Sequence, residues 1–200
     1  MDFMVNDILD FWFGNHASMV DTANNQAKLW WGKDPAVDSK IANQYETILD
    51  EIVEDQWPFA RNSAREILAA IILTDQFPRN IYRDTAKAFA YDGIARKLCR
   101  LLIDKKLDTE LTLIERVFAY LPLEHSEDIT DQVESLEKFD ELLHIAAAKD
   151  KAVFEQYAAY AKSHYDVIDK FGRFPHRNAS LGRDSTEKEQ AYLQQEGSGF

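Results

Sequence analysis

Apolar residues recur at every third or fourth position along most of this 200-residue chain. Over 151–171, for example, Val153, Tyr157, Ile168 and Phe171 fall on one stripe of a helix. No convincing run alternates apolar and polar residues between hairpin turns, as a β-strand would. The spacing therefore predicts an all-α fold of antiparallel helical hairpins.

Cap and breaker residues predict where the helices begin and end. Asp34-Pro35 supplies a cap followed by a first helical residue, and 186–189 (TEKE) fits a capping box that starts a short last helix. Pro78 is expected to force Phe77 out of helical geometry. A helix from about 108 to 120 is expected to stop at Pro122.

Composition favours one globular domain, and the net charge argues against nucleic acid as a partner. With 46% hydrophobic residues, the chain can bury a sizeable core, so we expect a single all-helical domain over 1–200, with 194–200 as a flexible tail. A net charge of −12 opposes nonspecific attraction to phosphodiester backbones, which requires a broad basic face.

Cysteine usage and hydropathy favour a cytoplasmic protein that does not enter a membrane. Cys99 is the only cysteine, which excludes an intrachain disulfide and a thiolate zinc cluster, and its helical context predicts a small buried hydrophobe. The amino terminus lacks the basic region and cleavage site of a secretion signal. The longest apolar run, Ile67 to Leu73, is far shorter than the ~18 residues of a membrane span.

The segment 164–186 concentrates positive charge in an acidic chain. From Gly172 to Arg183 there is no acidic residue, and this stretch holds one histidine, one asparagine and three arginines: Arg173, His176, Arg177, Asn178 and Arg183. We call the stretch from Arg173 to Arg183 the basic loop. Guanidinium groups match the geometry of carboxylates and phosphates, so the basic loop predicts a site for a small anion.

A structural role for the same arginines is the competing interpretation. Arginine often pins an irregular loop to helix carboxyl ends and to nearby acids, and Asp75, Asp84 or Glu127 are candidates for such pairing. The sequence leaves both interpretations open.

A second corner of the chain resembles the basic loop. Residues 77–80 (FPRN) and 174–178 (FPHRN) each close a helix with an aromatic residue, proline, a basic residue and asparagine. The turn preferences of Pro and Asn explain such a similarity by themselves. If the two corners meet in space, Asp75 and Arg79 join the basic loop in one ligand-binding site.

Two histidines are candidates for proton transfer. His176 lies in the basic loop, and imidazole titrates near working pH, so it is the better candidate for a general acid or base. His164 lies on the apolar stripe of its helix, where a buried, hydrogen-bonded imidazole is the ordinary explanation. No motif marks a nucleophile.

His125 lies close to Glu124, Glu127 and Asp128, an arrangement that raises the question of a metal site. No HExxH or HxH spacing supports a metal, and a proline-ended helix followed by a cap at Ser126 or a neighbour explains the segment. We therefore expect neither a metal nor another cofactor.

Five segments resemble one known family. They are FWF, AAIILTDQFPRNIYR, AFAYD, YLPLEHSED and HYDVIDKFGRFPHRNASLGRDST, and together they extend over roughly Ile8 to Leu193. The chain is similar in these segments to the bacterial family catalogued as domain of unknown function 924. The resemblance implies an all-helical fold similar to the tetratricopeptide-like superfamily, and it brings no reaction and no catalytic residue.

The leading hypothesis is an anion-accepting pocket formed by the corner after Asp75 and the loop from Arg173 to Arg183. It would hold a small acidic metabolite or a peptide carboxylate. One alternative is an enzyme that acts on such a ligand with His176 or His164 as the proton-transfer group. Another is a scaffold without a ligand, whose concave helical face binds a partner helix. The oligomeric state is left open by the sequence.

Overall fold

The protein is all-helical. The computed structural model describes residues 2–53, 57, 59–195 and 197–199, and these contain no β-strand, which confirms the predicted fold class. In chain order the helices are α1 (Asp2–Phe13), α2 (Met19–Trp31), α3 (Pro35–Val53), α4 (Ala64–Ile71), η1 (Ile72–Gln76), α5 (Phe77–Ile81), η2 (Ala86–Phe89), α6 (Asp92–Asp104), η3 (Leu107–Glu110), α7 (Leu113–Glu124), α8 (Ile129–Ile145), α9 (Lys151–Phe171), η4 (Pro175–Arg177) and α10 (Glu187–Leu193).

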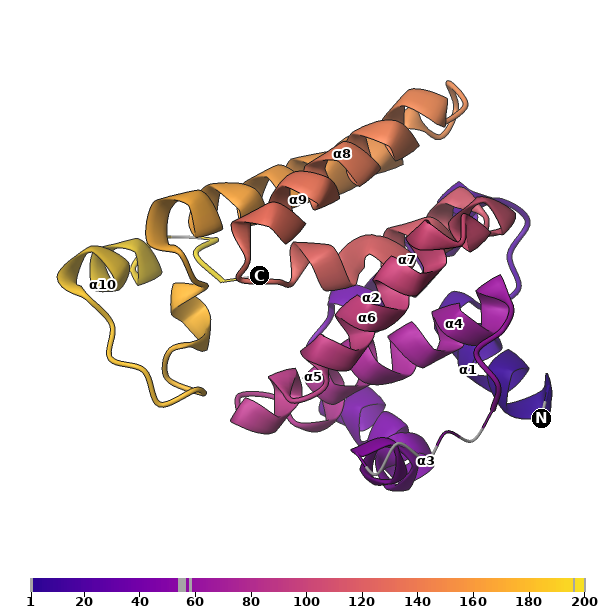
Figure 1. Cartoon of the computed structure of the whole chain (residues 1–200), viewed down its shortest axis with the longest axis horizontal. Helices are drawn as coiled ribbons and strands as arrows, with labels where there is room; N and C mark the ends of the chain where they lie inside the picture. The colour runs from indigo at the N-terminus through magenta and orange to yellow at the C-terminus, as the bar shows by residue number, and fades with distance from the viewer. Residues whose placement is uncertain (1, 54–56, 58, 196, 200) are drawn as a thin grey trace.

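The helices form a body and a protruding hairpin (Figure 1). Helices α1 to α7 gather on one side, while α8 and α9 run side by side as an antiparallel pair that packs back on α7. Helix α10 lies beyond the carboxyl end of α9, at the end of the pair opposite to the loop that joins α8 and α9. The predicted hairpin is thus present, whereas a tetratricopeptide-like array and the single-domain organisation stay predictions.

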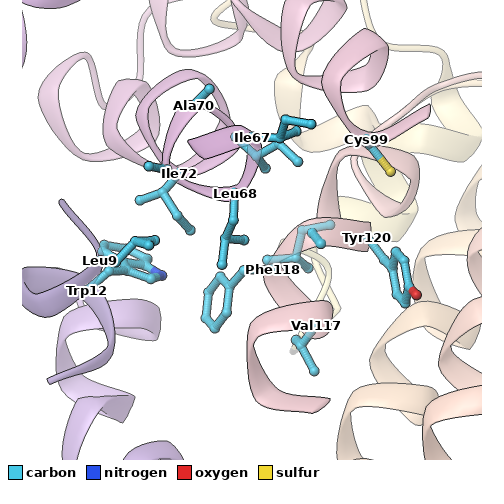
Figure 2. Packing of buried hydrophobic residues seen from close by; sticks show 14 of the residues in the cluster. Leu9, Trp12, Ile67, Leu68, Ala70, Ile72, Cys99, Val117, Phe118 and Tyr120 are labelled. Atoms are coloured by element: carbon cyan, nitrogen blue, oxygen red, sulfur yellow. The ribbon is translucent and has the colours of Figure 1, made fainter. Parts of the chain in front are cut away.

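Aromatic residues from distant helices build the centre of the core. Trp12 of α1 packs edge-on against Phe77 and Phe118, with ring centroids 5.7 Å apart in both pairs, and all three side chains have no solvent exposure. Figure 2 shows Leu68 of α4 pointing at Phe118, with Cys99 of α6 on the side of Tyr120. Cys99 is fully buried, as predicted. Burial of this kind is the main favourable contribution to folding.

Several predicted helix ends are confirmed by their hydrogen bonds. The carboxylate of Asp34 accepts from the amide of Ala36 at 2.8 Å at the start of α3. Thr186 and Glu189 form the expected capping box of α10. Helix α9 spans Lys151–Phe171, and Gly172 ends it in the left-handed conformation (φ +68°) that favours glycine.

Two predicted helix ends are wrong. Phe77 keeps helical geometry (φ −61°, ψ −38°), because the π-helical turn η1 pairs the Phe77 amide with the Ile72 carbonyl and carries the chain past Pro78 into α5. Helix α7 likewise continues through Pro122 to Glu124. In both places the proline is buried, so tertiary packing outweighs the hydrogen bond that proline cannot donate.

None of the helices in the described part of the chain combines the length and the apolar character that a membrane span needs.

Candidate active site

Six segments bring charged and titratable side chains together where α5, α6, α7 and α9 approach the basic loop. The contributing segments are η1, α5, the first turn of α6, the carboxyl end of α7, α9 and η4. Their side chains form what we call the polar cluster, which consists of Asp75, Arg79, Asp92, Glu124, His125, His164 and Arg177. The two similar corners of the sequence therefore do meet in space.

Asp75 and His125 form the centre of the polar cluster. Nδ1 of His125 lies 2.9 Å from Oδ1 and 3.0 Å from Oδ2 of Asp75, whose carboxylate has no solvent exposure. Burial opposes ionisation of Asp75, but the positive charge of Arg79 and the contacts with His125 and Gln76 together outweigh burial and lower the pKa of the carboxyl group. An ionised Asp75 only accepts hydrogen bonds, so Nδ1 of His125 carries the proton.

The position of Asp75 depends on the π-helical turn. In η1 the chain makes one wider turn between α4 and α5, and Asp75 lies within it. Such turns change the direction in which following side chains point and recur at functional sites in proteins. The side-chain amide of Gln76 also donates to the carboxylate of Asp75 and so helps to fix its position.

Arg79 joins Asp75 to α6. One of its terminal nitrogens lies 3.3 Å from Oδ1 of Asp75, and the guanidinium donates to both carboxylate oxygens of Asp92 at 2.9 and 3.1 Å. This two-pronged geometry is the strong form of an arginine to carboxylate contact. Arg79 is therefore largely satisfied by the protein's own acids.

Arg177 is the least compensated arginine of the polar cluster. It is 6% exposed, it donates to the carbonyl oxygen of His125 at 3.0 Å, and its nearest carboxylate oxygen, on Asp92, is 3.6 Å away. Its Nε is buried without a hydrogen-bond partner in the described part of the chain. Burial and the nearby charge of Arg79 lower the pKa of Arg177 to about 10.

Two aromatic rings contact the Arg177 guanidinium. It lies 4.7 Å from the ring centroid of Phe89 and 4.4 Å from that of Phe174. The ring faces attract the cation, and at a desolvated site such contacts contribute about 2 kcal/mol. Arg177 thus remains charged at neutral pH although its ionic contacts are weak.

Glu124 and His164 form a second acid and histidine pair beside the first. Nδ1 of His164 lies 3.1 Å from Oε1 of Glu124 and 2.9 Å from the carbonyl oxygen of Tyr160. Burial and the negative charge of Asp75 raise the pKa of Glu124 to about 8, while burial lowers that of His164 well below its usual value. At neutral pH Glu124 is therefore mostly protonated, whereas Asp75 is ionised.

His125 is neutral as well. Burial and Arg79 lower its pKa, and the contact with Asp75 opposes this change. Its side chain is 14% exposed, and among the described residues none forms a hydrogen bond with its second nitrogen, Nε2. Because Nδ1 carries the proton, Nε2 presents a lone pair that is able to accept a proton.

Arg183 and Arg173 are engaged inside the protein, as the structural interpretation expected. Arg183 donates to both oxygens of Glu127 at 2.6 and 2.9 Å and to Oδ1 of Asn178 at 3.0 Å. Arg173 donates to both oxygens of Glu189 at 2.6 and 2.8 Å, which lowers the pKa of that glutamate to about 2. These contacts tie the basic loop to the start of α8 and to α10.

Two further residues named from the sequence take no part in the ion pairs of Arg173 and Arg183. Asp84 is exposed and forms no ion pair with any described residue. His176 lies beside the polar cluster, with its ring centroid 5.5 Å from that of Phe174. Burial and the charge of Arg177 lower the pKa of His176 to about 4, so it is neutral at pH 7 and poorly suited to donate a proton there.

The sequence indicated that Asp75, Arg79 and Arg177 lie together on the condition that the two corners meet, and it did not indicate three other residues of the polar cluster. In the sequence, His125 and Glu124 raise only the question of a metal site, and no motif points to Asp92 as a site residue. One signal was present, because three acids and a histidine crowd the segment 121–128. Within the described ranges, no group of three or more His, Cys, Asp or Glu residues is arranged to hold a metal ion.

Comparisons with known proteins give a family and a fold but no reaction. The family model described as "Bacterial protein of unknown function (DUF924)" matches residues 8–197. A solved structure, that of the protein of unknown function ATU0120 from Agrobacterium tumefaciens, is similar with a TM-score of 0.80 and 30% sequence identity, covering 96% of this chain and 98% of that one. No curated protein matches the sequence.

Proposed function

Because the chain belongs to the bacterial family of unknown function DUF924, whose description names no activity, we propose a function from the polar cluster itself: an enzyme that transfers a proton on a small anionic molecule. His125 is the general base, oriented by Asp75, and Arg177 holds the carboxylate or phosphate of the substrate. The observation that carries the proposal is the contact of Nδ1 of His125 with both oxygens of the buried Asp75.

The proton step follows from the state of each group. Neutral His125 accepts a proton at Nε2 from the substrate or from a water molecule, and the resulting imidazolium is stabilised by the adjacent charge of Asp75. This compensation costs no reorganisation, since Asp75 is already ionised and fixed by Arg79. His125, reached from solvent, thus takes the role that the sequence gave to His176 or His164.

A second feature supports acid–base chemistry at this place. Asp75 and Glu124 are both buried carboxyl groups, yet the pKa of Asp75 is lowered and that of Glu124 is raised to about 8. Active sites often contain neighbouring titratable groups whose environments push their pKa values apart. Protonated Glu124 is a hydrogen-bond donor one residue before His125, so the polar cluster contains both a base and an acid.

Arg177 is the group to which we assign the anion. Its guanidinium is charged, held by two phenylalanine rings and incompletely paired, in contrast to Arg173 and Arg183. A ligand oxygen at Nε would satisfy a buried donor that otherwise costs about 1 to 3 kcal/mol. The expected ligand is therefore a small carboxylate or phosphate in the cytoplasm rather than a nucleic acid.

Binding is tested by thermal stabilisation with a panel of small mono- and dicarboxylates and phosphate esters. A ligand present at a hundred times its Kd stabilises the folded protein by about 2.7 kcal/mol, which is readily measured. The variants are Arg177→Gln and Arg177→Lys, with Arg65→Gln as the control on a half-exposed arginine. We expect both Arg177 variants to lose the stabilisation and the control to retain it.

Turnover is tested separately from binding. In D₂O, ligands that stabilise the protein are followed by NMR for deuterium exchange at carbon and for hydrolysis. His125→Asn is expected to abolish the change in the ligand while binding persists, and His144→Asn on exposed His144 is the control. Stabilisation that is equal in Arg177→Gln and in the unsubstituted protein contradicts the assigned anion site, and turnover unchanged in His125→Asn contradicts the base.

A further inference from the structure

Helix α6 borders two hollows on the surface away from the polar cluster. The first, of about 330 Å³, is lined by residues of α3, the segment after it and α6: Ile52, Trp57, Arg61, Ile94, Lys97, Leu98 and Leu101. The second, of about 690 Å³, lies between α6 and the start of α8 and includes Gly93, Ile94, Arg96, Lys97, Arg100 and Asp131. Both volumes are within the range that occupied binding sites have in proteins.

The two hollows lie next to each other along α6, because Ile94 and Lys97 line both. Within α6 their lining residues extend from Gly93 to Leu101. At about 1.5 Å per residue this is a length of about 12 Å, which is a little more than two turns of an α-helix. We call this surface the α6 groove.

The floor of the first hollow is apolar. Ile52 and Leu98 are buried there, and Ile94 and Leu101 are partly exposed beside them. These side chains come from α3 and α6, and Trp57, which follows α3 in the chain, also lines the hollow. Burying apolar surface of this kind contributes roughly 25 cal/mol per Å², which makes the hollow a place for apolar side chains of a partner.

The rim of the α6 groove carries more cations than acids, although the protein as a whole has a net charge of −12. Its charged lining residues are Arg61, Arg96, Lys97, Arg100, Asp128 and Asp131. Lys97 and Arg61 form no ion pair with any residue in the described part of the chain, and the Arg61 guanidinium lies 4.3 Å above the ring of Trp57. Arg96 and Arg100 are paired with Asp131, yet their side chains remain 41% and 45% exposed.

Incompletely paired cations therefore lie at the α6 groove as well as in the basic loop. In the basic loop Arg173 and Arg183 are each bound by a carboxylate and Arg177 is the incompletely paired arginine, whereas Lys97 and Arg61 line an apolar hollow and form no ion pair with a described residue. A groove with an apolar floor and cationic rim is complementary to a ligand with apolar side chains flanked by carboxylates.

We propose that the α6 groove docks an acidic amphipathic helix of a partner protein. Apolar residues of that helix, spaced three and four apart, enter the hollow between Ile52 and Leu98, and its glutamates or aspartates contact Lys97 and Arg61. The length of this surface, a little more than two turns of α6, favours a helix over a compact ligand. No residue of the α6 groove belongs to the polar cluster, so this proposal is independent of the proposed enzymatic function.

The test uses a fluorescein-labelled helical peptide of about 15 residues, with leucines on one face and glutamates on its flanks, and measures fluorescence anisotropy with the full-length protein. Arg61→Glu/Lys97→Glu is expected to weaken binding about tenfold or more, because like charges then oppose each other. The control Lys33→Glu/Lys105→Glu changes the net charge by the same amount at two exposed lysines outside the groove, and it is expected to leave binding nearly unchanged.

The location of binding is tested by NMR shift mapping with the same peptide, where changes should concentrate on α6 and the end of α3. A scrambled peptide with the same composition should bind at least about tenfold more weakly, since its leucines no longer share a face. Equal loss of binding in the two charge-reversed proteins would overturn the proposal, as would binding of decanoate at the groove without binding of the peptide.

Discussion

Nδ1 of His125 lies within 3.0 Å of both carboxylate oxygens of Asp75, so one imidazole proton is shared by two oxygens that no solvent reaches. The pair joins the π-helical turn to the end of α7, across 50 positions of the chain. It fixes which nitrogen of His125 is protonated, and it leaves the lone pair on Nε2.

Asp75→Asn should therefore change the tautomer of His125. In the unsubstituted protein we expect ¹⁵N NMR at pH 7 to show a neutral imidazole protonated at Nδ1. The variant removes the anion that holds this proton and leaves Arg79 with a weaker contact, which should destabilise the protein by about 3 to 5 kcal/mol. An unchanged His125 spectrum in a folded Asp75→Asn protein contradicts the assignment.

Glu124→Gln should stabilise the protein increasingly as the pH rises. Glu124 has a pKa of about 8 in the folded protein and an ordinary value of 4.5 when unfolded, so its contribution to stability is full below pH 4.5 and is lost as pH rises toward 8. Glutamine has no such loss. The difference in melting temperature between variant and unsubstituted protein should rise from pH 4.5 to pH 8, and a constant difference argues against a neutral buried Glu124.

For His176 we expect the contribution to folding stability to be lost as the pH falls, whereas that of Glu124 is lost as the pH rises. Its pKa is about 4 in the folded protein against 6.5 when unfolded, so the folded state favours neutral imidazole. The contribution is present above pH 6.5 and is lost as pH falls from 6.5 toward 4. Chemical denaturation across this range should show a shallower decline in the free energy of unfolding for His176→Asn, while exposed His144→Asn should keep the original decline.

Arg183 and Glu127 should show strong energetic coupling. Their side chains are 24% and 28% exposed and share two hydrogen bonds, and Glu127 also accepts from the amide of Phe174 at 2.8 Å. A double-mutant cycle with alanine should give about 1.5 to 3 kcal/mol. The exposed pair Lys87 and Asp50 should give less than about 1 kcal/mol. Equal coupling in the two cycles would show that Arg183 does not staple the basic loop.

Leu68→Ala should be among the most destabilising apolar truncations. Leu68 has no exposure and points at Phe118 in the centre of the core (Figure 2). Removing its side chain leaves a cavity, and the expected loss is about 2 to 5 kcal/mol in urea denaturation. Leu181, 36% exposed in the basic loop, is the matched control, and its alanine variant should stay within about 0.5 kcal/mol.

Local signals predicted those helices whose ends are set by neighbouring residues. The range of α9 and the capping box at Thr186 agree with the prediction because caps and glycine act through hydrogen bonds a few residues apart. Pro78 and Pro122 were expected to end helices and do not, because their effect depends on tertiary packing. A buried proline inside a helix is tolerated where packing of the surrounding side chains offsets its missing donor, and packing is not a local property.

The candidate site divides along the same line. The similarity of the two corners suggested that Arg79 and Arg177 would share one site if the corners met. Only the packing of the helices brings the two arginines together beside Asp92. His125 could not be recognised as the partner of Asp75, since nothing in its own segment refers to a residue 50 positions away.

The sequence by itself determined that this chain is helical, because the spacing of apolar residues along a backbone sets which periodic structure buries them. It also determined the family, since residues 8–197 carry that family's pattern. Tertiary structure alone decided which charges are neutralised. Electrostatic pairing depends on distances between atoms, so Glu127 and Glu189 satisfy arginines of the basic loop while Lys97 and Arg61 stay without an acid among the described residues.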